Sequence, residues 1–597
     1  MRTNVMLMVM MVVTAAMAEQ TERKNALAPR GEPAAEMLLA EQGTARYAIL
    51  IPADADSRER KAAEDLKQWL GDISGADFGI TENASPQGRY ISVGDTELAD
   101  APPSDLKDDG YAIGVKGEHL LLHGGRGRGT VNAVYALLEE DLGCRWYDGD
   151  PVLPRSQSLR IAPVPRAYVP QLRLRDPFYK VSFDETWSLR NRTNAPDAKV
   201  REEWGGRIDY GNFFVHTFHQ LVPPGKYFAE HPEYFQMNPD GQRVAVQLCT
   251  TNADLRQLVV DRVREILREQ PEIDILSISK MDTVQVCHCE PCKKLREEEG
   301  TDIANQLLLV NQVAEAIEAD HPYVVIDTLA YLETISVPKT MRPRKNVVIR
   351  LCNDSVGAWS KPFTPAEQCR VAELARAWSA VHDRIYIWDY NVNFSHYLAP
   401  MPNMDVIAAN IRFWVANNAE GVMTQGGYQG LAERDWLRSW VIAKLMWDPT
   451  LDHQALVDDF IHGYYGKAAP AIAEYEALLK RQAENHREQL ASPPSGIRYP
   501  MDIAFLSREF VVEADAIFAR ARELAGDDEK LLHKVERYEL PVMYVKLVRG
   551  PDFVGGGYAE VIDRFETIAR REGATHLAEG PANLDAMLAS WRAEVKP

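Results

Sequence analysis

Cysteines are few in this sequence of 597 residues, and basic residues are outnumbered by acidic ones. Lysine and arginine together number 67 against 87 aspartates and glutamates, so the formal net charge is −20. A chain with this excess of negative charge is not expected to bind nucleic acid or an anionic membrane, because both are polyanions. The 7 cysteines are too sparse for a disulfide scaffold, whose chains are small and rich in cysteine. Their odd number leaves at least one unpaired.

Long apolar runs are also missing beyond the first residues of the chain. No later segment reaches about 18 uninterrupted apolar residues, so we expect no membrane-spanning segment. Residues 1–18 combine Arg2, a short apolar run at Val5–Val13 and the small-residue motif Ala16-Met17-Ala18, which together are typical of a secretory signal peptide. Residues 19–36 would follow as a tether, and we expect the protein to be secreted or periplasmic.

The length of the chain exceeds a single hydrophobic core and suggests about three domains. Residues 37–165 alternate strand-like and helical patterns, which predicts an N-terminal α/β sandwich-like domain. Residues 449–597 show helical periodicity without strand-like runs, which predicts an α-helical C-terminal domain. The proline-rich segment Ala162–Pro170 is interpreted as a linker between the first domain and the next.

The central part, residues 171–448, carries short apolar segments separated by helical patterns. Eight segments are interpreted as strands: Arg173–Tyr179, Asn212–His216, Val244–Thr250, Ile273–Asp282, Val324–Glu333, Asn346–Asp354, Arg384–Asn391 and Gly421–Gln425. Helical periodicity fills several of the intervals, at Ala253–Glu269, Ile303–Ala319, Pro365–Val381 and Met404–Asn417. A strand–helix alternation repeated about eight times predicts a (β/α)₈ TIM barrel, in which the chemistry lies at the carboxyl ends of the strands.

Four of these segments carry a carboxylate at or near their end: Asp282, Glu333, Asp354 and Asp389. Glycoside hydrolysis needs two carboxyl groups at the scissile bond, one as proton donor and one as base or nucleophile. Neighbouring strands lie about 5 Å apart, so Asp282 and Glu333 can reach one bond. We predict Asp282 as general acid, or as the group that orients a substrate acetamido nucleophile, and Glu333 as its partner, with Asp354 and Asp389 in reserve. For any one acid taken alone, a helix cap or a solvated loop is the commoner role.

Polar and aromatic residues near the same strand ends are predicted to bind an oligosaccharide or polysaccharide substrate. His216 and His219 could hydrogen-bond sugar hydroxyls, although a loop histidine without such a role is as common. The flat faces of aromatic side chains suit sugar rings, although most aromatic residues fill cores. The predicted substrate-binding residues are His216, His219, Tyr331, Trp388, Tyr390, Asn393 and Gln425.

Three cysteines, Cys287, Cys289 and Cys292, follow the fourth predicted strand. They could bind a structural zinc ion with a fourth ligand from elsewhere, for which the candidates are His288, Cys249 and Cys352. A disulfide, or buried thiols that shape the loop, would explain the same spacing. The predicted chemistry requires no other cofactor, and a catalytic zinc is disfavoured because no H-E-x-x-H motif or histidine-rich set accompanies the cysteines.

The stretch from Gly127 to Tyr147 resembles the second helix of an α/β accessory domain that precedes the barrel in bacterial α-glucuronidases and β-N-acetylhexosaminidases. The following part of the chain resembles the large family catalogued as domain of unknown function 4838. The matching pieces are His231–Phe235, Leu248–Asn252, Ser277–Ser279 with Asp282 and the three cysteines, Leu329–Tyr331, Asn393–Tyr397 and Ala443–Pro449. Each piece is short but their order is specific, and the resemblance spans roughly residues 37–470.

Some members of that family are classified as glycoside hydrolases, including an endo-acting β-N-acetylglucosaminidase group that attacks N-glycans. The resemblance implies a secreted carbohydrate-active enzyme, whose candidate substrates include β-N-acetylglucosaminides and glycans containing uronic acid. In hexosaminidase-like barrels the proton donor after strand four usually belongs to an Asp-Glu pair, whereas here Thr283 follows Asp282. The alternatives are a glycan-binding barrel protein without catalysis and a zinc-dependent hydrolase built on the cysteine loop.

Overall fold

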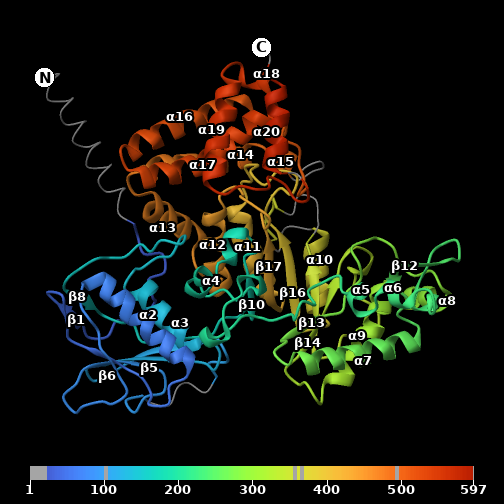
Figure 1. The fold of residues 1–597 in the computed structure, drawn as a ribbon, viewed down its shortest axis with the longest axis horizontal. Helices are drawn as coiled ribbons and strands as arrows, with labels where there is room; N and C mark the ends of the chain where they lie inside the picture. The colour runs from blue at the N-terminus through green and yellow to red at the C-terminus, as the bar shows by residue number, and fades with distance from the viewer. Residues whose placement is uncertain are drawn as a thin grey trace.

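The computed structural model describes residues 23–99, 105–353, 359–363, 369–490, 496–581 and 583–595. It shows a mixed α/β protein with a parallel sheet in its middle part, an α/β part formed by the start of the chain and a helical part formed by its end (Figure 1). The predicted signal peptide, residues 1–18, lies outside the described residues. Among the described helices, none combines the length and the apolar character that crossing a membrane requires.

The N-terminal α/β part contains two sheets, packed with the helices α2 and α3. The larger sheet has the order β4-β3-β5-β7-β6-β9, formed by Ile80–Thr81, Ala48–Leu50, Tyr90–Val93, His119–Gly124, Tyr111–Lys116 and Arg166–Tyr168. The smaller sheet has the order β2-β1-β8, formed by Thr44–Ala45, Met37–Glu41 and Leu159–Ile161. Helices α2 (Ser57–Ser74) and α3 (Gly129–Ala136) pack on the larger sheet, and apolar residues of both sheets and both helices form one core.

Helix α2 ends where Gly75 adopts a left-handed conformation with φ of 75°, which glycine tolerates without strain. One predicted boundary in this part differs from the structure. The predicted linker Ala162–Pro170 contains β9, in which Ala167 pairs with Ala112 of β6. Strand β9 lies at the edge of its sheet, where neighbouring prolines are tolerated because one side of the strand needs no partner.

The central sheet has six strands, all parallel, in the order β10-β17-β16-β15-β14-β13. These strands are Leu174–Asp176, Ala419–Gln425, Ile385–Tyr390, Val347–Cys352, Val325–Ala330 and Ile275–Ser277, and each coincides with a predicted strand. Helices occur at the predicted intervals, namely α7 (Ala253–Glu269), α9 (Ile303–Ile317), α10 (Arg370–Ser379) and α11 (Met404–Ala416). The shorter helices of this part are α4 (Glu185–Arg190), α5 (Phe218–Leu221), α6 (Pro224–Tyr227) and α8 (Glu290–Glu299).

The other two predicted strands are not members of this sheet. Around Asn212 the chain runs beside β13, with the Ser277 amide donating to the Phe213 carbonyl at 3.0 Å. It is not extended there, because Gly211 and Asn212 have φ of 53° and 68°, values outside the strand region. The third predicted strand becomes β12 (Arg243–Leu248), which pairs antiparallel with β11 (Phe235–Met237) across a tight turn.

The central sheet curls around its own interior. The edge strands β10 and β13 contribute Leu174 and Ile275 to one buried cluster, together with Val325, Val348 and Tyr386 of the strands between them. Residues Ile208 and Tyr210, from the segment between the edge strands, complete this cluster. Two edges that contact the same interior define a strongly curved half-barrel whose carboxyl ends open together on one face.

Inside the curl, above this apolar layer, lies a buried ion pair. Arg350 of β15 lies 2.6 Å from the Asp327 carboxylate of β14, and both side chains are fully buried. The guanidinium group also bonds the Tyr210 hydroxyl. The interior of the curl is therefore a packed, partly charged core rather than an open channel.

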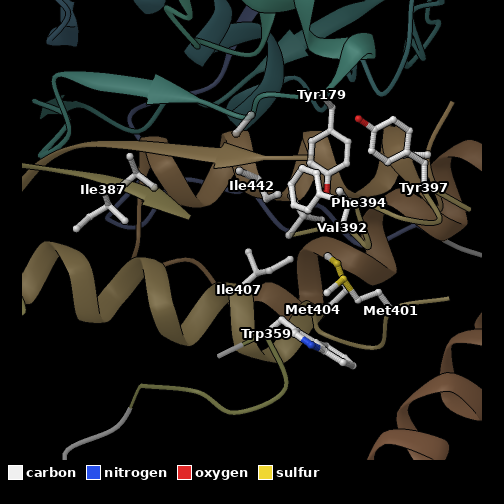
Figure 2. Close-up of a cluster of buried hydrophobic side chains, with 14 of the residues drawn as sticks. Tyr179, Trp359, Ile387, Val392, Phe394, Tyr397, Met401, Met404, Ile407 and Ile442 are labelled. Atoms are coloured by element: carbon white, nitrogen blue, oxygen red, sulfur yellow. The ribbon is translucent and has the colours of Figure 1, made fainter. Parts of the chain in front are cut away.

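The end of the chain is helical, as predicted. The helices are α12 (Asp435–Trp447), α13 (His453–Tyr465), α14 (Ala469–Asn485), α15 (Arg487–Leu490), α16 (Arg508–Ala525), α17 (Glu529–Arg549), α18 (Pro551–Val554), α19 (Tyr558–Arg571) and α20 (Leu584–Ala593). Past residue 449, the described ranges contain no strand and a single isolated bridge, between His576 and Asn583. One apolar core runs without a break from the outer face of the central sheet into these helices, and Ile387, Ile407 and Ile442 belong to it (Figure 2).

Candidate active site

A cavity of about 420 Å³ opens at the carboxyl ends of the central strands. Its described lining residues are Phe178, Phe214, His216, Asp282, Leu329, Tyr331, Cys352, Trp388, Tyr390, Phe394, Met423, Gln425, Tyr428, Ile497, Arg498 and Glu579. Asp282 and five of the predicted substrate-binding residues are in this set. Barrel-type enzymes carry their catalytic groups on this face, so the cavity is the candidate active site.

The alternation of side chains along a strand decides which residues reach the cavity. On β16, Trp388 and Tyr390 line the cavity, whereas Ile387, directly before Trp388, packs into the helix-side core. On β17, Gln425 faces inward, and its Oε1 accepts a hydrogen bond of 2.8 Å from the Trp388 indole nitrogen. This bond fixes the plane of the indole ring and the direction of the amide.

Aromatic rings form much of the wall. The rings of Phe214 and Trp388 stack with centroids 5.8 Å apart and planes inclined by 28°. The ring of Phe394 lies 5.6 Å from that of Tyr390, edge to face. Aromatic rings offer apolar faces to a ligand, and Tyr and Trp add a polar atom at the rim. A wall of this kind suits a ligand that is apolar on its faces and polar at its edges, as a sugar ring is.

Two described carboxylates line the cavity, and they come from different parts of the chain. Asp282 follows β13 and is exposed at the mouth. Glu579 comes from the helical part of the chain, where its carboxylate accepts hydrogen bonds from the Tyr428 hydroxyl at 3.3 Å and from the Arg498 guanidinium. Arg498 also lies over the Phe394 ring, 5.5 Å from its centroid.

Glu333 lies next to the cavity but not in the described lining. Its carboxylate is 3.3 Å from the ammonium group of Lys280, which is buried two residues before Asp282. Burial lowers the pKa of Lys280, and the charge of Glu333 opposes this effect. The Lys280 carbonyl accepts a bond of 2.8 Å from His216 Nδ1. Lys280 thus connects Glu333 and His216 to the loop that carries Asp282.

The backbone is strained at two positions beside the cavity. His216 and Leu332 both have φ of 53°, a left-handed conformation that a side chain such as leucine rarely adopts. Both residues are next to contacts of Lys280. His216 bonds the Lys280 carbonyl, and Leu332 directly precedes Glu333, whose carboxylate pairs with the Lys280 ammonium group. Strain of this kind costs about 1–3 kcal/mol and persists where the surrounding structure enforces it, which is frequent at functional sites.

Three predicted site residues point elsewhere. Asp389 faces the helix side of β16, because it alternates with Trp388 and Tyr390; it is buried, bonded by Asn353 Nδ2 at 2.6 Å, and burial raises the pKa of its carboxyl. The fully buried Asn393 donates to the Tyr499 carbonyl at 2.7 Å.

His219 lies on α5, away from the described lining, and burial lowers its pKa. The fourth predicted acid, Asp354, lies outside the described residues. Of the four acids, the structure therefore brings Asp282 into the cavity and Glu333 next to it.

Other lining residues were not predicted. Phe178, two residues beyond β10, continues the inward alternation of Leu174 and Asp176, so strand periodicity could have identified it. Arg498 and Glu579 follow the central sheet in sequence and enter the cavity only because the helical part folds over the strand ends. No local pattern in the sequence signals such a contact.

The three cysteines after β13 lie together with a fourth, Cys249. The sulfur atoms of all four are within 4.8 Å of one another, and all four residues are buried. Of the candidates for a fourth ligand, Cys249 therefore has the right position, while Cys352 lines the cavity instead. Among the described residues, the cluster of Cys249 with the three cysteines is the group that could hold a metal ion.

The family described as "Domain of unknown function (DUF4838)" matches residues 147–477. No curated protein matches the chain. Among solved structures, a family GH115 4-O-methyl-α-glucuronidase with specificity for decorated arabinogalactans has a TM-score of 0.54 and 11% identity, over 90% of this chain and 77% of that chain. An N-acetyl-β-hexosaminidase from Streptomyces plicatus has a TM-score of 0.41 and 14% identity, over 74% and 96%. The first likeness shows a glycoside-hydrolase-like fold.

Proposed function

The chain belongs to the DUF4838 family, and we propose that it is a secreted glycoside hydrolase that cleaves O-glycosidic bonds of an oligosaccharide or polysaccharide. The observation that carries this proposal is the cavity at the carboxyl ends of the parallel strands, which combines aromatic walls with the exposed carboxylate of Asp282. We further propose that the curved six-stranded sheet is a (β/α)₈ barrel in which irregular segments replace two strands, flanked by separate N-terminal and C-terminal domains.

Asp282 is proposed as the residue that transfers a proton to or from the glycosidic oxygen. It lies at the mouth of the cavity on the loop after β13, where a bound sugar would meet it. Cleavage begins when a carboxylic acid protonates the leaving oxygen as the bond to the anomeric carbon breaks. If the substrate carries a 2-acetamido group as nucleophile, the same residue would orient that group instead.

The second carboxylate is proposed to be Glu333, with Glu579 as the competing candidate. Glu333 follows the strand next to β13 and is held by its ion pair with Lys280. Glu579 lines the cavity itself, but it is engaged by Arg498 and Tyr428. Either would supply the base or nucleophile that completes hydrolysis.

The cavity walls are proposed to bind the sugar. Trp388 and Tyr390 would stack on sugar rings, and His216, Tyr331 and Gln425 would hydrogen-bond hydroxyl groups. Arg498 adds a guanidinium group to the cavity, which matches the carboxylate of a uronic acid. A glycan containing uronic acid is therefore one proposed substrate, and a β-N-acetylglucosaminide is the other.

Carboxamide variants test these roles on any glycan that the wild type cleaves. We expect Asp282→Asn to lower kcat by about 10²–10⁴-fold, because it removes a proton-transfer catalyst. A comparable loss in either Glu333→Gln or Glu579→Gln identifies the second carboxylate. Glu269→Gln, at the exposed end of α7, is the matched control. Wild-type turnover in Asp282→Asn, Glu333→Gln and Glu579→Gln alike would exclude the proposed mechanism.

A specific observation favours a second candidate, a glycan-binding protein without catalysis. Two described carboxylates line the cavity, and one of them, Glu579, is paired with Arg498. A cavity of aromatic rings with one unpaired acid could bind a glycan without cleaving it. That candidate predicts that a glycan binds to the cavity and is not cleaved. Neither the wild type nor any carboxamide variant would then form product.

A further inference from the structure

Four cysteines form a compact, buried cluster beside the central sheet. Cys249 follows β12, and Cys287, Cys289 and Cys292 lie between β13 and the first turn of α8. The Cys249 sulfur is 3.5 Å from that of Cys289 and 4.0 Å from that of Cys292, and the Cys287 and Cys289 sulfurs are 3.4 Å apart. No pair in the cluster is at disulfide-bond length, which is about 2.0 Å.

We propose that these four cysteines bind one zinc ion in a structural site. Zinc–sulfur bonds of about 2.3 Å in tetrahedral geometry place the sulfur atoms about 3.8 Å apart, which matches the observed spacings. Four cysteine ligands complete the tetrahedron and leave no position for water or substrate, so the ion would have a structural and not a catalytic role. The argument for this site does not rest on the proposed glycosidase activity.

The surroundings of the cluster support a metal–thiolate site. The Met237 amide donates to the Cys287 sulfur at 3.3 Å, and the Thr251 hydroxyl lies 3.1 Å from the Cys292 sulfur. Hydrogen bonds of this kind hold metal-bound thiolates in place. Arg243 and Arg256 lie within electrostatic range of Cys249, and their charges would offset the net negative charge of a zinc bound by four thiolates.

The ion would add to the hydrogen bonds that already connect two segments, such as that from the His288 amide to the Met237 carbonyl at 2.8 Å. It would fix the β11–β12 hairpin to the loop that runs from β13 to α8. The same two segments are joined by Gln247, whose side-chain amide both donates to the Met281 carbonyl and accepts from the Met281 amide, each at 2.9 Å. Met281 directly precedes Asp282, so the zinc site would hold the loop that carries this residue at the mouth of the cavity.

The direct test is the metal content of the purified full-length chain, measured by inductively coupled plasma mass spectrometry. We expect about one zinc ion per chain, and a decrease of at least about tenfold in Cys249→Ser and in Cys292→Ser. Cys369→Ser is the matched control, because Cys369 lies outside the cluster, and it should keep its zinc. If the cluster variants do not fold, cobalt(II) added to the metal-depleted wild type should give the visible spectrum of a tetrahedral tetrathiolate.

A second measurement tests the structural role. On removal of zinc from the wild type, amide hydrogen exchange should accelerate in residues 281–292 and not in α16. A wild-type chain that holds less than about a tenth of an equivalent of zinc, both as purified and after zinc is added, would overturn the proposal. A disulfide between two of the four cysteines, found after alkylation without reduction, would overturn it as well.

Discussion

Asp176, at the end of β10, shows how the interior of the curled sheet acts on a single residue. The residue is 2% exposed, and one of its carboxyl oxygens has no hydrogen-bond partner among the described residues. Burial raises the pKa of Asp176 well above its usual value, and the charge of Asp197 adds to this. When the pKa of a carboxyl is higher in the folded than in the unfolded state, the free energy of unfolding of the protein falls as pH rises, because the unfolded state gives up the proton first.

Replacing Asp176 with asparagine removes this titration. Unfolded aspartate ionises near pH 3.9, so above about pH 4 the wild type is destabilised as pH rises and the variant is not. We therefore expect the Tm of Asp176→Asn to increase relative to that of the wild type as pH rises from about 4 towards 8. Thermal unfolding across this range measures the difference. Asp240→Asn, at an exposed turn, should show none of this growth. A constant difference for Asp176→Asn would mean that the buried carboxyl does not hold its proton.

At the scale of single residues, the sequence located the strand ends but not the direction of each side chain. Asp282 lines the cavity. Asp389 does not, although its neighbours Trp388 and Tyr390 do; period-two alternation already forbids all three from facing one side. Glu333 lies beyond its strand, after the left-handed Leu332, so alternation could not have placed its side chain.

Among the elements, strand β17 depends on a glycine for its fit to the curl. A Cβ atom at Gly421 would lie 2.8 Å from the Tyr386 ring and 2.9 Å from the Leu174 Cβ. We expect Gly421→Ala to lower the free energy of unfolding by about 1–3 kcal/mol, because neighbouring strands must move apart. Urea denaturation measures the loss. Gly79→Ala, where a Cβ would meet no atom within 4 Å, is the control, and equal effects of the two substitutions would contradict the packing argument.

Helices were predicted more faithfully than strands, for a physical reason. Helix α7 has the predicted bounds, and its N-cap Asn252 accepts a bond from the Leu255 amide, because helix periodicity and capping are local. Strand pairing is not local. The second predicted strand fails at Gly211 and Asn212, and the third pairs with a nearby segment across a turn instead of joining the sheet.

Across the whole molecule, buried charges connect the N-terminal α/β part to helix α12. Glu139 accepts hydrogen bonds from the Lys444 ammonium at 2.6 Å and from Arg192 at 2.7 Å, and all three side chains are buried. Burial alone would raise the pKa of Glu139, but the charges of Lys444 and Arg192 hold it below its usual value. The ionised carboxylate is therefore the form that joins the two parts.

Removing one cation from this cluster should be costly. We expect Lys444→Met to lower the free energy of unfolding by about 3–5 kcal/mol, because Glu139 loses a partner in a buried setting. The control is Lys67→Met, which breaks the exposed ion pair of Lys67 and Asp77. It should lower the free energy of unfolding by less than about 1 kcal/mol. Chemical denaturation of both variants gives the comparison. A loss for Lys444→Met no larger than that for Lys67→Met would show that the cluster does not hold the parts together.

The sequence does not predict that the helical part lies over the strand ends. Its helices were predicted from periodicity, but their position determines that Arg498 and Glu579 line the cavity. These residues lie in sequence far from the strands that form the rest of the wall, and packing of one part on another leaves no local pattern. The composition of the cavity is thus a property of the assembled chain.

The most direct test of the proposed function is the release of new reducing ends from a panel of glycans by the wild-type protein, measured beside the binding of the same glycans. The panel should include β-N-acetylglucosaminides and glycans decorated with uronic acids. If the cavity is a glycosidase active site, at least one glycan that binds will also be cleaved, and Trp388→Ala will weaken both. Tight binding that Trp388→Ala abolishes, with no new reducing ends from any glycan, would contradict catalysis at this site.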